Sequence, residues 1–160
     1  MTQTVNVLGL IRANDTAVAP SPSYWVLKLF RDEAGRVGVP VEYAGPTVDL
    51  PGGLRTGVLD ASATYDPDTG KLAVFIVNRS AACAREVTVR FSGTTIGSPR
   101  TACILAAPSF LAANDYTNPA AVTPRKWTTR PAGDSQVNTL VPPHSLVVIR
   151  APARQTNHPG

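Results

Sequence analysis

Side chains that carry acid, metal or redox chemistry are scarce in this chain of 160 residues, which has three glutamates, two histidines, two cysteines and one methionine. These cysteines and histidines do not lie at the spacing of metal ligands, so no metal site is predicted. No apolar run approaches the roughly 18 residues of a membrane span. The N-terminal stretch lacks the basic region and small-residue cleavage site of a signal peptide, which favours a cytoplasmic location.

Positive charge is in excess but not concentrated. The net charge is +4, and arginines such as Arg31, Arg79 and Arg125 recur along the whole chain without forming a block. A nucleic-acid partner would require a clustered basic face, so none is predicted. The stretches LPGGLRTG and FSGTTIG lack the spacing of a phosphate-binding loop, and no cofactor is predicted.

The two cysteines, Cys83 and Cys103, each lie in or beside a strand-like run. This placement suits two buried free thiols, the interpretation favoured for a chain without an export signal. A disulfide between neighbouring strands remains open, because sequence spacing does not fix the distance between their Cα atoms.

Proline and glycine are abundant, with fifteen and twelve residues, and they separate short β-branched runs. This pattern predicts a mainly β fold, a β-sandwich with jelly-roll or Greek-key connections and one N-terminal helix. The helix is expected over residues 22–34, capped by Ser21, opened by Pro22 and ended by Gly35. A buried strand is expected at 4–11 and a loop at 12–20.

The remaining strands are expected at regular intervals. Residues 39–57 hold several prolines and glycines and indicate an edge strand and a loop. KLAVFIVN is apolar on both faces of the strand and therefore predicts a central strand. REVTVRF alternates, with Val87, Val89 and Phe91 expected inward. Further strands are expected at 58–66, 100–107 and 136–151.

No catalytic residue is predicted. Glu33, Glu42 and Glu86 are each expected to be solvated carboxylates. Asp60 is expected to bond nearby backbone, and Asp66 with Asp68 to shape a turn. His144 and Ser145 are adjacent on a strand, so they point to opposite faces and neither activates the other. This pair is expected at a rim, after the corner that Pro142 and Pro143 impose.

Two weaker patterns concern sugars. Trp25, Trp127 and Tyr116 would form a stacking surface if the fold brought them together, although scattered aromatics more often serve packing. Asn14 and Asn78 begin N-glycosylation sequons, which matter only in an exported chain.

Five segments, QTVNVLGLI, SYWVLKLFRDEAG, LDASATYDPDTGKLAVFIVNRS, NPAAVTPRKW and LVPPHSLVVIR, occur in an order that resembles the C-terminal region of α-L-arabinofuranosidases of glycoside hydrolase family 51. The resemblance covers residues 1 to about 151. It implies a catalytic (β/α)₈ barrel elsewhere in the parent enzyme, with residues 1–36 similar to its last strand and helix. Residues 37–151 would form the sandwich and 152–160 a disordered tail.

The resemblance also bears on activity. In this family both catalytic groups are glutamates on earlier barrel strands, which this chain does not include. Gln3 matches a glutamine that contacts arabinose at the start of the last barrel strand, and it is the single substrate-binding residue that the resemblance implies.

Three hypotheses follow. The favoured one is a non-catalytic accessory sandwich that supports the barrel of an arabinofuranosidase acting on arabinose-containing polysaccharides. The others are a free-standing carbohydrate-binding module for such polymers and the C-terminal piece of a split enzyme that is active only with a separate barrel. The apolar faces of 4–11 and 22–34 would then contact the barrel or a second copy in a homo-oligomer.

Overall fold

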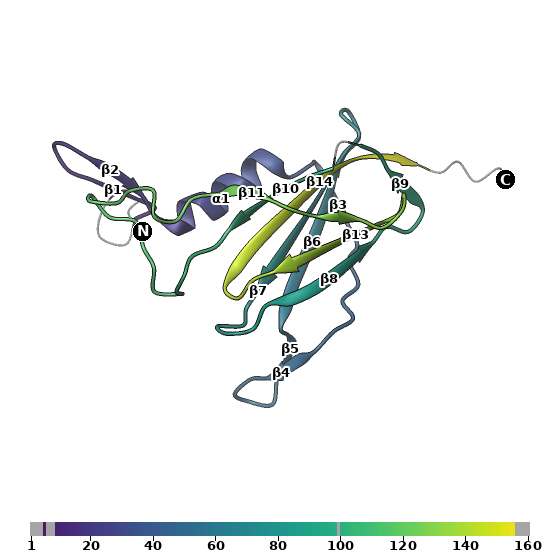
Figure 1. Cartoon of the computed structure of the whole chain (residues 1–160), viewed down its shortest axis with the longest axis horizontal. Helices are drawn as coiled ribbons and strands as arrows, with labels where there is room; N and C mark the ends of the chain where they lie inside the picture. Colours follow the sequence, from purple (N-terminus) through teal and green to yellow (C-terminus); the bar gives the residue numbers. More distant parts are fainter. Residues whose placement is uncertain (1–4, 6–8, 99, 156–160) are drawn as a thin grey trace.

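The computed structural model describes residues 5, 9–98 and 100–155 (Figure 1). Its centre is a large antiparallel sheet in the order β11-β10-β14-β7-β6-β3, with β9 pairing the far end of β14. The bounds of these strands are β3 Val37–Val39, β6 Leu59–Asp66, β7 Lys71–Asn78, β9 Thr94–Ile96, β10 Thr101–Leu105, β11 Arg125–Trp127 and β14 Ser145–Gln155.

A second sheet has the order β12-β13-β8, and its strands are β8 Arg85–Arg90, β12 Arg130–Pro131 and β13 Gln136–Val141. It packs on one face of the large sheet, and the core between them includes Val74 and Ile76 of β7 and Val137 of β13. Val87, Val89 and Phe91 pack against this core, as their alternation predicted. The predicted mainly β sandwich with one helix is confirmed.

Helix α1, Pro22–Glu33, covers the other face of the large sheet (Figure 1). Alternation along β7 explains why that strand is apolar throughout. Leu72, Val74 and Ile76 belong to the core between the sheets, whereas Ala73 and Phe75 belong to the core under the helix. The molecule therefore has three layers, and β7 is buried from both sides, as a central strand should be.

The helix begins as predicted, because Ser21 Oγ accepts a hydrogen bond from the Tyr24 amide and Pro22 occupies the first turn. It ends at Glu33, with Ala34 as the cap. Gly35 instead allows the backbone after the helix to pass close to β6, because a Cβ there would lie 2.3 Å from the Tyr65 carbonyl carbon. Its amide donates to Thr64 Oγ1 at 2.8 Å, which ties the helix end to β6.

Two short hairpins were not predicted. Residues 12–20, expected as a loop, contain the β1–β2 hairpin, Ile11–Ala13 with Val18–Pro20. The region 39–57, expected as an edge strand and a loop, contains a second hairpin, β4–β5, Thr47–Asp49 with Arg55–Gly57. The edge strand of the large sheet, β3 at Val37–Val39, shares only its last residue with that region. Three-residue strands give too short an alternation to be read from sequence.

Several boundaries also differ from expectation. Half of the strand expected at 4–11, residues 4 and 6–8, lies outside the described residues, and Val5 makes an isolated bridge to Ile11. The expected disordered tail from 152 is corrected in part, because β14 continues to Gln155 and pairs with β9. Residues 156–160 lie outside the described part. The short strands β11 and β12 were not predicted.

Both cysteines are free thiols, as favoured, but only Cys103 is buried and Cys83 is exposed. Burial raises the pKa of the Cys103 thiol. Asp60 does not bond the backbone as expected: it forms an exposed ion pair with Arg79 at 2.5 Å. Asp66 shapes its turn as predicted, accepting from the Asp68 amide and the Thr69 hydroxyl.

Candidate functional site

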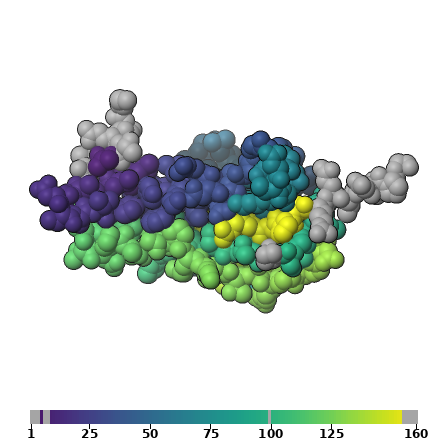
Figure 2. Space-filling view, turned by 90° about the horizontal axis from the view of Figure 1, so that it is seen from above, coloured from purple at the N-terminus to yellow at the C-terminus, as the bar shows by residue number. Residues whose placement is uncertain are grey.

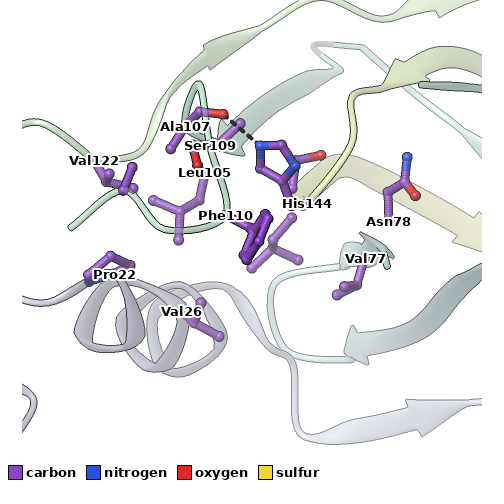
Figure 3. A pocket seen from close by; sticks show the side chains of 14 residues that line it. Pro22, Val26, Val77, Asn78, Leu105, Ala107, Ser109, Phe110, Val122 and His144 are labelled. Atoms are coloured by element: carbon purple, nitrogen blue, oxygen red, sulfur yellow. Dashed lines mark hydrogen bonds between the residues drawn. The ribbon is translucent and has the colours of Figure 1, made fainter. Parts of the chain in front are cut away.

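A cavity of about 340 Å³ lies where helix α1 meets the ends of the central strands (Figure 3). Its walls are mostly apolar and come from α1, the end of β7, the turn before β14 and the loop after β10. The lining includes Pro22, Val26, Leu105, Phe110 and Val122. Phe110 is 69% exposed and stands at the open side.

Four polar side chains line this cavity, and each is engaged with backbone. The Ser109 hydroxyl accepts a hydrogen bond from the Leu111 amide at 3.1 Å. Asn78 donates to the carbonyl oxygens of Cys83 and Val141 at 2.9 and 3.0 Å. Ser145 Oγ donates to the Pro142 carbonyl at 2.7 Å. His144 Nε2 lies 2.9 Å from the Ala107 carbonyl oxygen, to which it donates (Figure 3).

His144 and Ser145 therefore do not form a nucleophile and base. The His144 ring nitrogen that could accept a proton, Nδ1, is buried without a hydrogen-bond partner. The Ser145 hydroxyl bonds a carbonyl instead of this nitrogen. The pair was expected to be adjacent on a strand and to face opposite ways, but His144 lies in the turn before β14 and both residues line the cavity. The backbone at His144 has a φ of 39°, which fits the tight turn between β13 and β14.

Glu33 differs most from its expected role. It was expected to be solvated, but its side chain is 14% exposed and bridges two cations. Oε2 lies 2.7 Å from Lys71 Nζ on β7, and Oε1 lies 2.7 Å from Arg150 Nη1 on β14. The carboxylate thus connects the last turn of α1 to the adjacent strands β7 and β14. We name these three residues the Glu33 clamp.

The clamp was not visible from sequence because its partners lie 38 and 117 residues away. Each partner follows or precedes an apolar strand run, so only the strand pairing brings them together. The register places Arg150 opposite Ala73, two residues from Lys71 on β7. Both cations therefore meet the helix end on the same side of the sheet.

The other two glutamates are exposed, as predicted. Glu42 lies in the segment before β4, and Glu86 on β8 is 3.7 Å from Arg130 with 82% of its side chain exposed. Retaining glycosidases need two carboxyl groups about 5–5.5 Å apart. In the described part of the chain, the partly buried Glu33 is already bound by two cations and is suited to holding structure.

The three aromatics proposed as a stacking surface are not assembled into one. Trp25 packs in the core under the helix, Trp127 packs in the core between the sheets, and Tyr116 lies on the loop before β11. Trp127 Nε1 donates to the Leu140 carbonyl at 2.9 Å. Trp25 makes an edge-on contact with Tyr24, and the two ring centroids are 5.2 Å apart. The two tryptophan rings serve packing, and Tyr116 is 43% exposed on its loop.

The remaining sequence candidates have plain outcomes. Gln3 lies outside the described residues. Asn78 is 1% exposed, so its sequon is closed in this fold, whereas Asn14 is exposed on the β1–β2 turn. Within residues 5, 9–98 and 100–155, no three histidine, cysteine, aspartate or glutamate side chains gather as a metal site would require. No helix of that part is long and apolar enough to span a membrane.

Comparison with known proteins identifies the fold's family. A family model described as the α-L-arabinofuranosidase C-terminal domain matches residues 1–145. The chain belongs to this family. No curated protein sequence matches it.

Solved structures of family members agree. The chain is similar to the family 51 arabinofuranosidase of Xanthomonas axonopodis pv. citri, with a TM-score of 0.82 and 26% identity over 93% of this chain and 30% of that one. It is also similar to the thermostable family 51 α-L-arabinofuranosidase of Thermotoga petrophila RKU-1, with a TM-score of 0.80 and 26% identity over 92% of this chain and 32% of that one. The chain thus spans about a third of these relatives.

The fold itself is shared more widely than the family. A family 30 xylanase C from Talaromyces cellulolyticus has a TM-score of 0.62 at 18% identity, over 92% of this chain and 28% of that one. Identity this low shows the fold alone. What places the chain among arabinofuranosidase C-terminal domains is the family match over residues 1–145.

Proposed function

We propose that this chain is the non-catalytic β-sandwich of an α-L-arabinofuranosidase that acts on arabinose-containing polysaccharides, and that it supports the catalytic barrel. The observation that carries the proposal is the family match over residues 1–145, in a chain whose partly buried Glu33 is bound by two cations in the Glu33 clamp. In this function, the chain contributes a rigid surface and no reacting group.

The surface for the barrel is the N-terminal side of the molecule. Helix α1 is fixed to the large sheet by the clamp, by Leu29 at 8% exposure and by the stacked rings of Phe30 and Phe75, 4.2 Å apart. Its opposite face presents Leu27 at 55% exposure, and the β1–β2 hairpin presents Val18 at 57%. Exposed Ser23, Arg31 and Asp32 lie on the same helix, so this side of α1 is of mixed polarity. Exposed apolar side chains at Leu27 and Val18, on firmly held elements, are suited to a partner domain.

The sequence predicts that this same face binds either the barrel or a second copy of the chain. A substitution at Leu27 would weaken contacts made through this face and leave contacts made elsewhere unchanged. Gln3, by its resemblance to the arabinose-contacting glutamine, would serve an active site completed by the barrel. A split enzyme would use the same surface with a separately encoded barrel, so it differs from the favoured function only in how the polypeptides are joined.

Polysaccharide pull-down distinguishes this proposal from a free-standing carbohydrate-binding module. The purified chain is mixed with insoluble arabinan and arabinoxylan, with Trp25→Ala and Trp127→Ala variants alongside, and bound protein is measured after centrifugation. We expect the chain to stay in the supernatant, because its tryptophans serve packing. Saturable binding that competes with free arabino-oligosaccharide would contradict the accessory function and support the binding module.

A further inference from the structure

The two sheets of the sandwich differ in width. The large sheet lays six strands side by side, from β11 to β3, whereas the second sheet has the three strands β12, β13 and β8. Figure 2 shows the layers from above, with the blue helix on one side, the yellow end of β14 in the middle and the light-green residues of β12 and β13 on the other. Since β12 follows β11 after only Thr128 and Thr129, it lies on the β11 side, and β8 lies toward β6 and β3 (Figure 1).

Strand β8 has an unpaired edge. Among the described residues it pairs with β13 alone, and the Phe91 amide donates to the Ser135 carbonyl at 2.9 Å in the same register. In an antiparallel ladder every second residue bonds the partner strand, so those counted back from Phe91 bond β13. The backbone amides and carbonyls of the residues between them, Glu86, Thr88 and Arg90, point away from β13. We name these three residues the β8 edge.

The large sheet is open beside this edge. Val37 lies opposite Tyr65, and Val39 follows on the same face, which is the face of the core between the sheets. Val37 is 48% exposed, and Val39 and Tyr65 are only partly buried. On the second sheet, Val89 is likewise only partly buried, although its neighbour Val137 on β13 is fully buried. The core therefore lacks a cover over β6 and β3, where a strand next to β8 would lie.

We propose that a strand from the part of an α-L-arabinofuranosidase polypeptide outside this chain pairs with the β8 edge and completes the second sheet. This inference rests on the proposed function. A row of unpaired amides and carbonyls above an apolar floor is specific for an extended segment, because the backbone gives affinity and alternate side chains fill the floor. The chain spans 30% of the Xanthomonas relative, so most of such a polypeptide is available to supply the strand.

The geometry also specifies the donor. Its alternate side chains should be apolar, to cover Val39 and Tyr65, and those between them polar, with an acidic residue opposite Arg90 and a basic one opposite Glu86. A second copy of this chain does not fit as donor. Its own β8 lies over its own large sheet, which would enter the space that β6 and β3 already fill.

A synthetic peptide of residues 84–92, AREVTVRFS, tests whether the edge accepts a strand. Paired antiparallel about Thr88, the peptide has the required alternation and places its own Arg90 opposite Glu86. Fluorescence anisotropy with the full chain should show saturable binding. Thr88→Pro removes an amide that does not bond β13, so the variant should fold and bind at least about tenfold more weakly. Thr88→Val keeps the amide and should bind as the wild type does.

The peptide carries its own matched control, which does not depend on how a variant folds. Methylation of its Thr88 amide, which points at the β8 edge, should abolish binding, whereas methylation of its Val89 amide, which points to solvent, should not. Failure of the unmodified peptide to bind, or binding that ignores both Thr88→Pro and the methyl group, overturns the proposal.

The donor is tested with overlapping peptides of about 15 residues, long enough for one strand, from the part of the Thermotoga petrophila relative that this chain does not match. We expect an alternating segment to capture the labelled wild-type chain and not Thr88→Pro. If AREVTVRFS binds but no such peptide does, the parent polypeptide is not the donor. A dimer in sedimentation velocity that Thr88→Pro dissociates would also overturn the proposal, in favour of a second copy. None of these readouts involves hydrolysis or polysaccharide binding, so the accessory function stands or falls separately.

Discussion

Glu33 is the residue on which the position of α1 depends most. Replacing it with glutamine keeps the shape of the side chain and removes the charge that holds Lys71 and Arg150. Loss of one partner from a fully buried ion pair costs about 3–5 kcal/mol. Here the Lys71 and Arg150 side chains are 35% and 29% exposed and regain some water. We expect Glu33→Gln to lower the free energy of unfolding by about 1–3 kcal/mol in urea denaturation.

Glu86→Gln is the matched control, because Glu86 is an exposed carboxylate 3.7 Å from a single arginine. It should change the free energy of unfolding by less than about 0.5 kcal/mol. Equal effects of the two substitutions would show that the clamp contributes no more than an ordinary surface ion pair.

At the same scale, the sequence predicted some side chains well and others poorly. The Ser21 cap and the Asp66 turn depend on residues two or three positions away, and both were predictable. Glu33 and Gly35 depend on strands that follow much later in the chain. An exposed glutamate is the ordinary expectation, and only the register of β7 and β14 overturns it.

Among the elements, the loop between β10 and β11 is held mainly through Asn114, which is 2% exposed. Its Nδ2 donates to the Pro20 carbonyl at 2.6 Å and to the Val122 carbonyl at 2.9 Å, and its Oδ1 accepts from the Val122 amide at 2.7 Å. This one amide joins the loop to β2, which leads into α1. The loop supplies Phe110 and Val122 to the cavity.

Asn114→Ala should therefore loosen the loop as a unit. Removing the amide leaves buried backbone groups without partners, and we expect a loss of about 1–3 kcal/mol in the free energy of unfolding. Hydrogen–deuterium exchange should become faster at the Val122 amide, while amides of β7 exchange as before. Asn118→Ala, in the same loop but exposed, is the control. Unchanged exchange at Val122 in Asn114→Ala would contradict this role.

The long elements were predictable and the short ones were not. Strands β6, β7 and β8 and helix α1 have six to twelve residues, enough for their periodicity to show. The hairpins β1–β2 and β4–β5 have three residues per strand, and their prolines and glycines resemble those of loops. For this reason neither hairpin could have been found from sequence.

At the scale of the whole molecule, the sandwich and the helix form one three-layered body. The sequence predicted the β-sandwich and the helix but assigned the helix, with residues 1–36, to a neighbouring barrel. The packing of α1 against the large sheet, through Leu29, Phe30 and the Glu33 clamp, makes it equally a layer of the sandwich. Periodicity shows that a helix has an apolar face; it does not show what covers that face.

The central proposal is that this chain is a non-catalytic domain that supports a catalytic barrel. The direct measurement is release of p-nitrophenol from p-nitrophenyl α-L-arabinofuranoside by the purified chain, compared with a blank purified in parallel from cells without it. The account predicts a rate equal to the blank at every enzyme concentration. A rate that rises in proportion to the chain, and persists through repeated purification, would contradict it and require a pair of carboxyl groups that the described fold does not assemble.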